Sequence, residues 1–463
     1  MVADQNQETH VLMVSAALQG HLNPLLKFAK CLISKGIHVT LVTTELARHR
    51  MLKHAAAATN PLIKLEFFSD GLDVDFNRES DYDLWLETLK TKGRENFSNL
   101  TAKLSQHTKF SCLILHQFVP WFIPVAKEHN IPCAVLWIQP CALYSIYYRF
   151  FNKLNDFSIL HNPERLLELP GHPLMEIQDI PSFILPNIHL CFQKLLAEFF
   201  EYLVDVKWVL GTSFEELEEE VLGAMVGDGI QPTVTTIGPL VSRFLLGKKE
   251  EGENGVSVDM WKADESCLRW LDGKEIGSVV YVSFGSIIVL GQEQVDNIAM
   301  GLLNSGKPFL WVFKRTGASN VELPSGFLEA VGDRGLVVNW CSQEQVLKHK
   351  AVGCFLTHCG WNSTQETVVT GVPVIAFPEW TDQPTNAKLL TDVFKMGVRM
   401  RKGDDGIVSP NEVERCIKEI TEGPAAEAMA KRAEELKVSA MKAVEDGGSS
   451  HRNLEKFIAD IVG

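Results

Sequence analysis

Short apolar runs alternate with longer amphipathic segments along most of this sequence. The runs have the length and the β-branched or aromatic content of buried strands, whereas the segments between them have helical spacing. Strands are expected at residues 11–14, 37–43, 63–67, 110–115, 131–138, 209–213, 278–286, 309–313, 335–340 and 351–357. Because strands that alternate with helices form βαβ units, we expect an α/β protein with parallel sheets.

The first βαβ unit spans residues 10–44. Its first strand leads into a polar loop and an amphipathic helix that continues to about Lys35, and Gly36 ends that helix. Loops at the carboxyl ends of parallel strands carry ligands, and His21 lies in the first of these loops. A histidine at such a place is more often a capping or packing residue than a ligand contact, so its position alone assigns it no role.

A second candidate region is the strand-loop-helix unit at residues 351–371. Gly360 allows a close backbone approach in its loop, residues 363–366 have the pattern of a capping box that opens a helix, and Gly371 ends the helix. A helix N-terminus attracts phosphate, and the donor side chains beside this one would be His358, Asn362 and Ser363. Polar strand-loop-helix units occur in every α/β protein, so this pattern alone gives anion binding and an ordinary turn equal weight.

Length and composition predict two domains without a membrane span. A chain of 463 residues with 46% hydrophobic content is too long for one core. The net charge of −14 argues against nucleic acid or an anionic membrane as a partner. The polar N-terminus does not resemble a signal peptide, and no apolar run has the length to cross a bilayer, so we expect a cytoplasmic protein. The ten cysteines lack ligand spacing, so no metal site is expected.

A charged, glycine-containing segment at residues 241–262 has the composition of a linker. It separates a first domain, expected at residues 1–240, from a second at residues 263–445.

Residues 340–383, WCSQEQVLKHKAVGCFLTHCGWNSTQETVVTGVPVIAFPEWTDQ, resemble the signature segment of plant specialised-metabolite UDP-glycosyltransferases, which belong to glycosyltransferase family 1. The resemblance extends over essentially the whole chain. It implies the GT-B fold, in which two Rossmann-like domains with parallel sheets face each other. The first domain would hold the acceptor and the second the UDP-sugar, and a C-terminal helix at residues 446–463 would pack back on the first domain.

The resemblance also implies a donor site. Trp340 would stack on uracil, Gln343 and Glu366 would contact the ribose, and Cys341 belongs to the same segment. The diphosphate contacts would be Ser286, His358, Asn362 and Ser363. The sugar contacts would be Trp361, Asp382 and Gln383. A closing glutamine together with the inner tryptophan favours UDP-glucose, which would be a co-substrate, and no other cofactor is implied.

On the acceptor side, the sequence differs from the family pattern at one position. Residues 19–24, QGHLNP, resemble the family motif whose histidine is the general base, which assigns that role to His21. Most relatives place an aspartate partner two residues before Phe118, where this chain has His116. A neutral imidazole cannot supply a carboxylate's charge. Three explanations are open. His116 could relay the proton, or another acidic residue could reach His21. Alternatively, the acceptor could be acidic enough to lose its proton with little help from a base.

Aromatic residues of the first half would also line the acceptor pocket, although such residues more often belong to a core. The candidates are Phe118, Trp121, Phe122 and Tyr144. No motif reports on oligomeric state, and a monomer is the expectation.

The expected function is therefore an inverting, UDP-glucose-dependent glucosyltransferase that forms β-O-glucosides of small phenolic metabolites of the flavonoid, stilbene or simple phenol type. One alternative is an enzyme that forms glucose esters of aromatic carboxylic acids. A second alternative, from another class, is a UDP-sugar-binding protein with little turnover.

Overall fold

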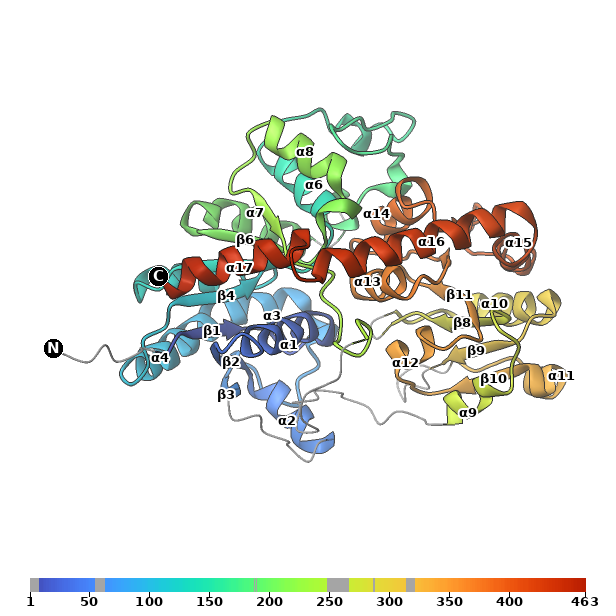
Figure 1. The fold of residues 1–463 in the computed structure, drawn as a ribbon, viewed down its shortest axis with the longest axis horizontal. Coiled ribbons are helices and arrows are strands. Elements are labelled where there is room, and N and C mark those ends of the chain that lie inside the picture. Colours follow the sequence, from blue (N-terminus) through green and yellow to red (C-terminus); the bar gives the residue numbers. More distant parts are fainter. Residues whose placement is uncertain are drawn as a thin grey trace.

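Two parallel β-sheets organise the chain (Figure 1). The computed structural model describes residues 8–54, 63–186, 188, 190–247, 266–285, 288–313 and 321–463. The first sheet has the strand order β3-β2-β1-β4-β5-β6-β7. Its strands are β1 (His10–Val14), β2 (His38–Thr44), β3 (Ile63–Phe68), β4 (Cys112–His116), β5 (Cys133–Trp137), β6 (Trp208–Gly211) and β7 (Val234–Thr236).

The second sheet has the order β10-β9-β8-β11-β12-β13. Its strands are β8 (Val279–Ser283), β9 (Phe309–Val312), β10 (Gly335–Val338), β11 (Val352–Thr357), β12 (Val374–Ala376) and β13 (Gly397–Arg399). Every expected strand is present in these two sheets. Three further strands, β7, β12 and β13, have three residues each and were too short to show a pattern in the sequence.

Helices connect the strands. Those of the first half are α1 (Gln19–Ile33), α2 (Glu45–His54), α3 (Tyr82–Thr88), α4 (Arg94–Ser105), α5 (Ile123–Glu128), α6 (Cys141–Phe151), α7 (Leu190–Tyr202) and α8 (Glu219–Gly227). Those of the second half are α9 (Ser266–Asp272), α10 (Gln292–Ser305), α11 (Phe327–Val331), α12 (Gln343–Leu347), α13 (Trp361–Thr370), α14 (Gln383–Lys388), α15 (Pro410–Thr421), α16 (Gly423–Val444) and α17 (Ser449–Val462).

The topology places two ligand-binding edges in the molecule. In each sheet the strand order reverses beside the first strand, between β1 and β4 in one and between β8 and β11 in the other. Open parallel sheets bind ligands in the crevice outside the carboxyl ends of their strands at such a switch point. His21 follows β1, His116 ends β4, Gly285 follows β8 and His358 follows β11, so all four lie at these edges.

The second sheet is covered on both faces, because alternate residues of its strands belong to different apolar clusters. On β8, Val280 and Val282 pack with α10 and α15, whereas Val279 and Tyr281 pack with α9 and α12. The core of the first sheet is larger and includes buried residues of α13, α16 and α17 from the end of the chain. One continuous apolar core therefore joins the first sheet to these late helices.

The last two helices run lengthwise along the molecule, from the second sheet to the first (Figure 1). The aromatic ring of Phe457 on α17 packs against Phe28 of α1 and lies edge-on to Trp208 of β6, at centroid distances of 6.2 and 5.5 Å. The Asn453 side-chain amide donates to the Thr236 carbonyl at 2.9 Å. The chain end thus contacts the first sheet.

The start of α13 differs from the sequence expectation. The helix begins at Trp361 with Gly360 as its N-cap residue, and residues 363–366 lie inside the helix instead of capping it. Gly360 provides no side-chain oxygen, so the first backbone N–H groups of α13 are not capped by their own loop. Gly371 ends the helix in the left-handed conformation, as the sequence predicts.

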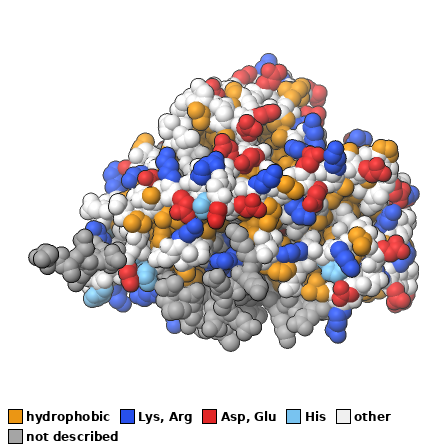
Figure 2. Space-filling view, viewed as in Figure 1, with side chains coloured by type: hydrophobic (Ala, Val, Ile, Leu, Met, Phe, Trp, Pro, Cys, Tyr) orange, Lys and Arg blue, Asp and Glu red, His pale blue; other side chains and the backbone are white. Residues whose placement is uncertain are grey.

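The predicted linker at 241–262 lies outside the described residues from 248 onward. On the face drawn in Figure 2, the positive and negative side chains of the described residues are interspersed and form no broad patch of one sign. Among the helices that the structure describes, none combines the length and apolar composition needed to cross a bilayer.

Candidate active site

A large cavity lies between the two sheets at the carboxyl ends of their strands. Residues from both halves of the chain line it. Of the predicted donor-site residues, those that line it are Trp340, Cys341, Gln343, His358, Trp361, Asn362, Ser363, Glu366, Asp382 and Gln383. Ser286, the remaining one, lies outside the described residues.

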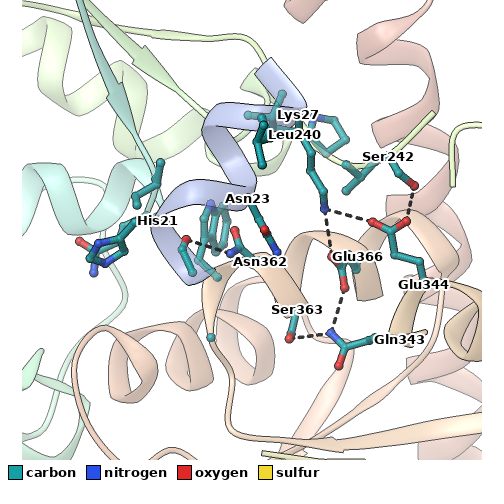
Figure 3. Close-up of a pocket in the computed structure, with 18 of the residues that line it drawn as sticks. His21, Asn23, Lys27, Leu240, Ser242, Gln343, Glu344, Asn362, Ser363 and Glu366 are labelled. Atoms are coloured by element: carbon teal, nitrogen blue, oxygen red, sulfur yellow. Dashed lines mark hydrogen bonds and ion pairs between the residues drawn. The ribbon is translucent and has the colours of Figure 1, made fainter. Parts of the chain in front are cut away.

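The corner of the cavity between α12 and α13 forms a polar network (Figure 3). The Gln343 side-chain amide donates to Ser363 Oγ at 2.8 Å and to Glu366 Oε2 at 2.9 Å. The Tyr281 hydroxyl donates to the amide oxygen of Gln343 at 3.4 Å. These bonds fix the orientation of Gln343 and leave the Glu366 carboxylate facing the cavity, where it can accept hydrogen bonds from a diol.

The imidazole of His358 is held between two glycines. A Cβ atom on Gly285 would lie 2.7 Å from the ring, and a Cβ atom on Gly360 would lie 2.5 Å from its Nε2 atom. Gly285 also has a φ of +73°, which favours glycine. Only glycine at both positions therefore leaves room for this ring.

His358 and the start of α13 are suited to an anion. Burial lowers the pKa of His358 to about 4. Its Nδ1 atom is buried and has no hydrogen-bond partner among the described residues. The uncapped N–H groups of α13 lie beside it, at the positive end of the helix dipole. A diphosphate would supply acceptors for these donors, so the residues fit that group.

Asn362 connects this corner to the other half of the molecule. Its side-chain amide donates to the Gly20 carbonyl of α1 at 3.2 Å (Figure 3). Within α1 that carbonyl would normally accept from residue 24, but residue 24 is a proline without an N–H group. Pro24 therefore frees the carbonyl that Asn362 binds across the cavity.

Two of the expected sugar contacts, Asp382 and Gln383, line the same cavity at the start of α14. Asp382 is buried and accepts hydrogen bonds from Thr381 at 2.7 Å and Asn386 at 2.6 Å. Burial raises the pKa of its carboxyl group. The amide oxygen of Gln383 accepts from the backbone N–H groups of residues 379 and 380, which leaves its NH₂ group for a ligand.

Trp361 lines the same cavity, but its indole N–H already donates to Thr212 Oγ1 of the first half at 3.0 Å. The indole N–H is therefore not available to a sugar hydroxyl in this arrangement.

His21 lies in the first turn of α1, since that helix begins earlier than the sequence predicts. Its ring stacks on Phe118 with a centroid distance of 4.6 Å and an interplanar angle of 4°. Burial lowers the pKa of His21 to about 3, and its Nδ1 atom has no hydrogen-bond partner among the described residues. The imidazole is therefore neutral at neutral pH and can accept a proton at the cavity.

His116 lies next to His21 but does not hydrogen-bond to it. Its Nδ1 atom accepts from the Phe118 backbone N–H at 3.2 Å, so the ring proton of the neutral imidazole is on Nε2. Nε2 then donates to Ser15 Oγ at 3.2 Å, and the Ser15 hydroxyl donates to the Ala16 carbonyl. Both nitrogen atoms of His116 are occupied, so the described bonds provide no proton path from His21 through His116.

Of the four aromatic residues predicted for the acceptor side, Phe118 lines the cavity and the other three do not. Trp121 donates its indole N–H to Glu198, Phe122 packs on Phe97, and Tyr144 packs edge-on to Trp137. All three are buried in the core of the first half, where large aromatic residues are usually found.

A row of aromatic rings continues from Phe118 into the cavity. Phe183 lies edge-on to Phe118, Phe192 stacks on Phe183 at 4.9 Å, and Tyr82 lies edge-on to Phe192 at 5.2 Å. All of them line the cavity. The sequence did not identify Tyr82, Phe183 and Phe192, because they come from α3, the 3-10 helix at Ser182–Ile184 and α7, which no local pattern brings together.

Residues 269–430 match the family described as UDP-glucoronosyl and UDP-glucosyl transferase. The chain is also 48% identical over 451 residues to UDP-glycosyltransferase 84B2 of Arabidopsis thaliana, and the match covers 97% of this chain and 99% of that protein. The chain belongs to the UDP-glycosyltransferase family. This confirms the resemblance found in the sequence and makes the protein a hexosyl-transferring enzyme of that family.

Two further relatives of this UDP-glycosyltransferase are informative. Gallate 1-beta-glucosyltransferase of Quercus robur is 41% identical, over 98% of this chain and 89% of that protein. The crystal structure of Os79 from O. sativa in complex with UDP has a TM-score of 0.85 and 32% identity, and the match covers 98% of this chain and 100% of that one. The predicted GT-B fold of two Rossmann-like domains with parallel sheets is confirmed.

Proposed function

We propose that this UDP-glycosyltransferase transfers glucose from UDP-glucose to an oxygen atom of a small phenolic acceptor, with inversion at the anomeric carbon. The observation that carries the proposal is the donor corner, where the Gln343–Glu366 network lies beside His358 and the uncapped start of α13. A ribose diol and a diphosphate match these groups. The solved UDP complex of Os79 supports a UDP donor, and the glucose preference rests on the sequence resemblance.

The proposed reaction is a single displacement. The acceptor oxygen forms a bond to the anomeric carbon as the bond from that carbon to the diphosphate oxygen breaks. His21 accepts the acceptor proton, and UDP leaves with its charge stabilised by His358, Asn362, Ser363 and the N-terminus of α13. Asp382 and Gln383 would hold the glucose hydroxyls. We propose Ser286 as a further diphosphate contact and Trp340 as the uracil platform on the strength of the resemblance.

The row of aromatic rings supports an aromatic acceptor. It begins at Phe118, which is stacked on His21, and extends through Phe183 and Phe192 to Tyr82. A planar acceptor ring can pack against this row close to the imidazole of His21, and such ring contacts are worth about 0.5–1.5 kcal/mol each beyond burial.

Transfer to a carboxylate, which forms a glucose ester, is the second candidate and has an observation of its own. His21 has no carboxylate partner among the described residues, and burial lowers its pKa to about 3. A base of this kind is weak against a phenol. A benzoic or cinnamic acid is already ionised at neutral pH, so its oxygen attacks without a base. The name of the Quercus robur relative, a gallate 1-beta-glucosyltransferase, supports the same acceptor class.

Products formed from one acceptor that carries both groups distinguish the candidates. Purified protein is given UDP-glucose and 4-hydroxybenzoate, and the products are separated by mass and by lability to mild alkali. Ester formation by a mechanism that needs no base predicts that His21→Ala loses hydroxyl transfer by about 10²-fold or more and retains most of its ester formation. Equal loss of both products would reject the base-free route.

Failure of wild-type protein to transfer glucose to any member of a panel of phenols and aromatic acids, with UDP-glucose bound, would reject the enzyme proposal. That outcome would favour the UDP-sugar-binding alternative. The proposal also includes a first domain at 1–240 for the acceptor, a second at 263–445 for the donor, a monomeric state and a cytoplasmic location, all of which rest on the sequence expectations.

A further inference from the structure

Lys27 connects the two halves of the enzyme at the donor corner. It lies on α1, six residues after His21, and its ammonium group reaches across the cavity to α12 and α13 (Figure 3). Lys27 Nζ lies 3.1 Å from Glu344 Oε1 and 3.1 Å from Glu366 Oε1. The side chains of Lys27, Glu344 and Glu366 are 19%, 22% and 10% exposed, so all three charges are largely removed from water.

The two carboxylates carry more charge than Lys27 neutralises. Glu344 has one further partner, the hydroxyl of Ser242, and Glu366 has the neutral amide of Gln343. Burial lowers the pKa of Lys27, but the two carboxylates raise it further, so its pKa lies above the ordinary lysine value. Lys27 is therefore charged at neutral pH and leaves a net charge of about −1 on this cluster.

This cluster lies close to the proposed diphosphate contacts. Glu366 accepts from Gln343, and the same nitrogen of Gln343 donates to Ser363, so two hydrogen bonds separate the carboxylate from a proposed phosphate donor. This separation is shorter than the Debye length of about 8 Å at physiological ionic strength. Without Lys27, two negative charges would act on the anionic nucleotide.

We propose that Lys27 is a positioning residue of the donor site, which acts on the nucleotide through Glu344 and Glu366 by neutralising their repulsion of the diphosphate. The proposal deepens the proposed function and rests on it, because it requires that the corner binds UDP. It differs from a purely structural role for the ion pairs, since its effect depends on the charge of the ligand.

The test is the affinity of the purified full-length protein for UDP and for uridine, which has the same base and ribose but no phosphate. Calorimetry measures UDP, and competition against UDP measures uridine. The variants are Lys27→Met, Lys27→Arg, and Lys27→Met combined with Glu344→Gln. The melting temperature of each variant checks that it is folded.

We expect Lys27→Met to weaken UDP binding by about tenfold or more and uridine binding by no more than about twofold. Lys27→Arg keeps the charge and should stay within about threefold of wild type. Adding Glu344→Gln to Lys27→Met removes one of the two uncompensated charges and should restore most of the UDP affinity.

Equal weakening of UDP and uridine by Lys27→Met would overturn the inference, because it would indicate a structural role. Unchanged UDP affinity in Lys27→Met, or no recovery in the double variant, would overturn it as well. Wild-type protein that binds no UDP would overturn the proposed function together with this inference, whereas normal binding by wild type and by Lys27→Met would overturn the inference alone.

Discussion

His21 has a setting that suits an acceptor of low pKa. Its ring is stacked on Phe118 and buried, and the two nitrogen atoms of the adjacent His116 are bonded to Ser15 and to the Phe118 backbone. A general base gains strength when a neighbouring anion stabilises its protonated form. No such anion reaches His21 among the described residues, so the imidazole keeps its neutral form and gains little from accepting a proton.

Introducing the missing charge should change the products. An aspartate at position 116 can accept from the Phe118 N–H, as His116 Nδ1 does now, and from the Ser15 hydroxyl once that hydroxyl turns from the Ala16 carbonyl, and it would lie next to the imidazole of His21. His116→Asp is expected to raise the pKa of His21 and to increase transfer to phenolic hydroxyls by roughly tenfold relative to transfer to carboxylates. Product ratios with 4-hydroxybenzoate measure this change.

His116→Asn is the matched control because it has the same shape without the charge, and it should leave the product ratio near that of wild type. If Asp and Asn shift the ratio equally, the effect comes from packing and the charge argument fails.

At the same scale, the sequence identified donor-site residues better than acceptor-site residues. Trp340 to Gln383 form one continuous segment, so a single resemblance could assign its contacts, and all of its candidates line the cavity. The roles of these residues stay predictions. Phe183 and Phe192 lie in segments with no motif, and Lys27 could be placed opposite Glu366 only through the packing of α1 against the second half.

At the scale of elements, the loop from β11 to α13 brings a histidine, a glycine and a helix N-terminus to one point. Gly360 serves as the N-cap residue and also leaves space for His358. The sequence suggested a capping box at residues 363–366 because Ser and Glu have the right spacing, but the strand ends at Thr357 and the helix starts too soon for that box to form. Local spacing alone could not fix the first residue of the helix.

Gly360→Ala tests the double role of this glycine. The added methyl group would lie 2.5 Å from His358 Nε2, so the ring must move away from the start of α13. We expect UDP affinity to fall by about tenfold, the typical effect of losing one hydrogen bond to a charged group. Equilibrium binding of UDP by the folded variant gives the measurement.

Gly223→Ala provides the control for this substitution. Gly223 lies in helix α8, where an added Cβ atom meets nothing within 4 Å, and it is not among the cavity-lining residues. This variant should bind UDP like wild type and be slightly more stable, because alanine favours a helix by about 1 kcal/mol over glycine. A Gly360→Ala variant that binds UDP normally would show that His358 is not held by this contact.

At the scale of the whole molecule, the late helices complete the core of the first sheet. Phe457 is 2% exposed and contacts both Phe28 and Trp208. Phe457→Ala should therefore cost about 3–5 kcal/mol of stability, as large-to-small substitutions in cores do. Thermal unfolding of the variant should begin several degrees lower than that of wild type.

Val462→Ala is a suitable control on the same helix, because Val462 is 57% exposed and should contribute little. If the unfolding temperature falls equally for both variants, the loss of stability does not come from the contact of Phe457 with the first sheet.

The whole-molecule architecture was the most predictable level. Alternating apolar and amphipathic segments determine a βαβ succession, and that succession permits few arrangements other than parallel sheets covered by helices. The core that the first sheet shares with α16 and α17 could not be predicted in the same way. The buried positions of these two helices look like those of any amphipathic helix and do not specify which sheet the helices cover.

The shared core has a consequence for biosynthesis. The strands of the first sheet leave the ribosome early, but Phe457, which closes part of their core, is made roughly 220 residues after β7 ends at Thr236. At ordinary elongation rates the interval is on the order of 10 to 40 s. During that time the nascent first half exposes the apolar surface of Phe28 and Trp208, so it should be a client of ribosome-associated chaperones until the last helix is released.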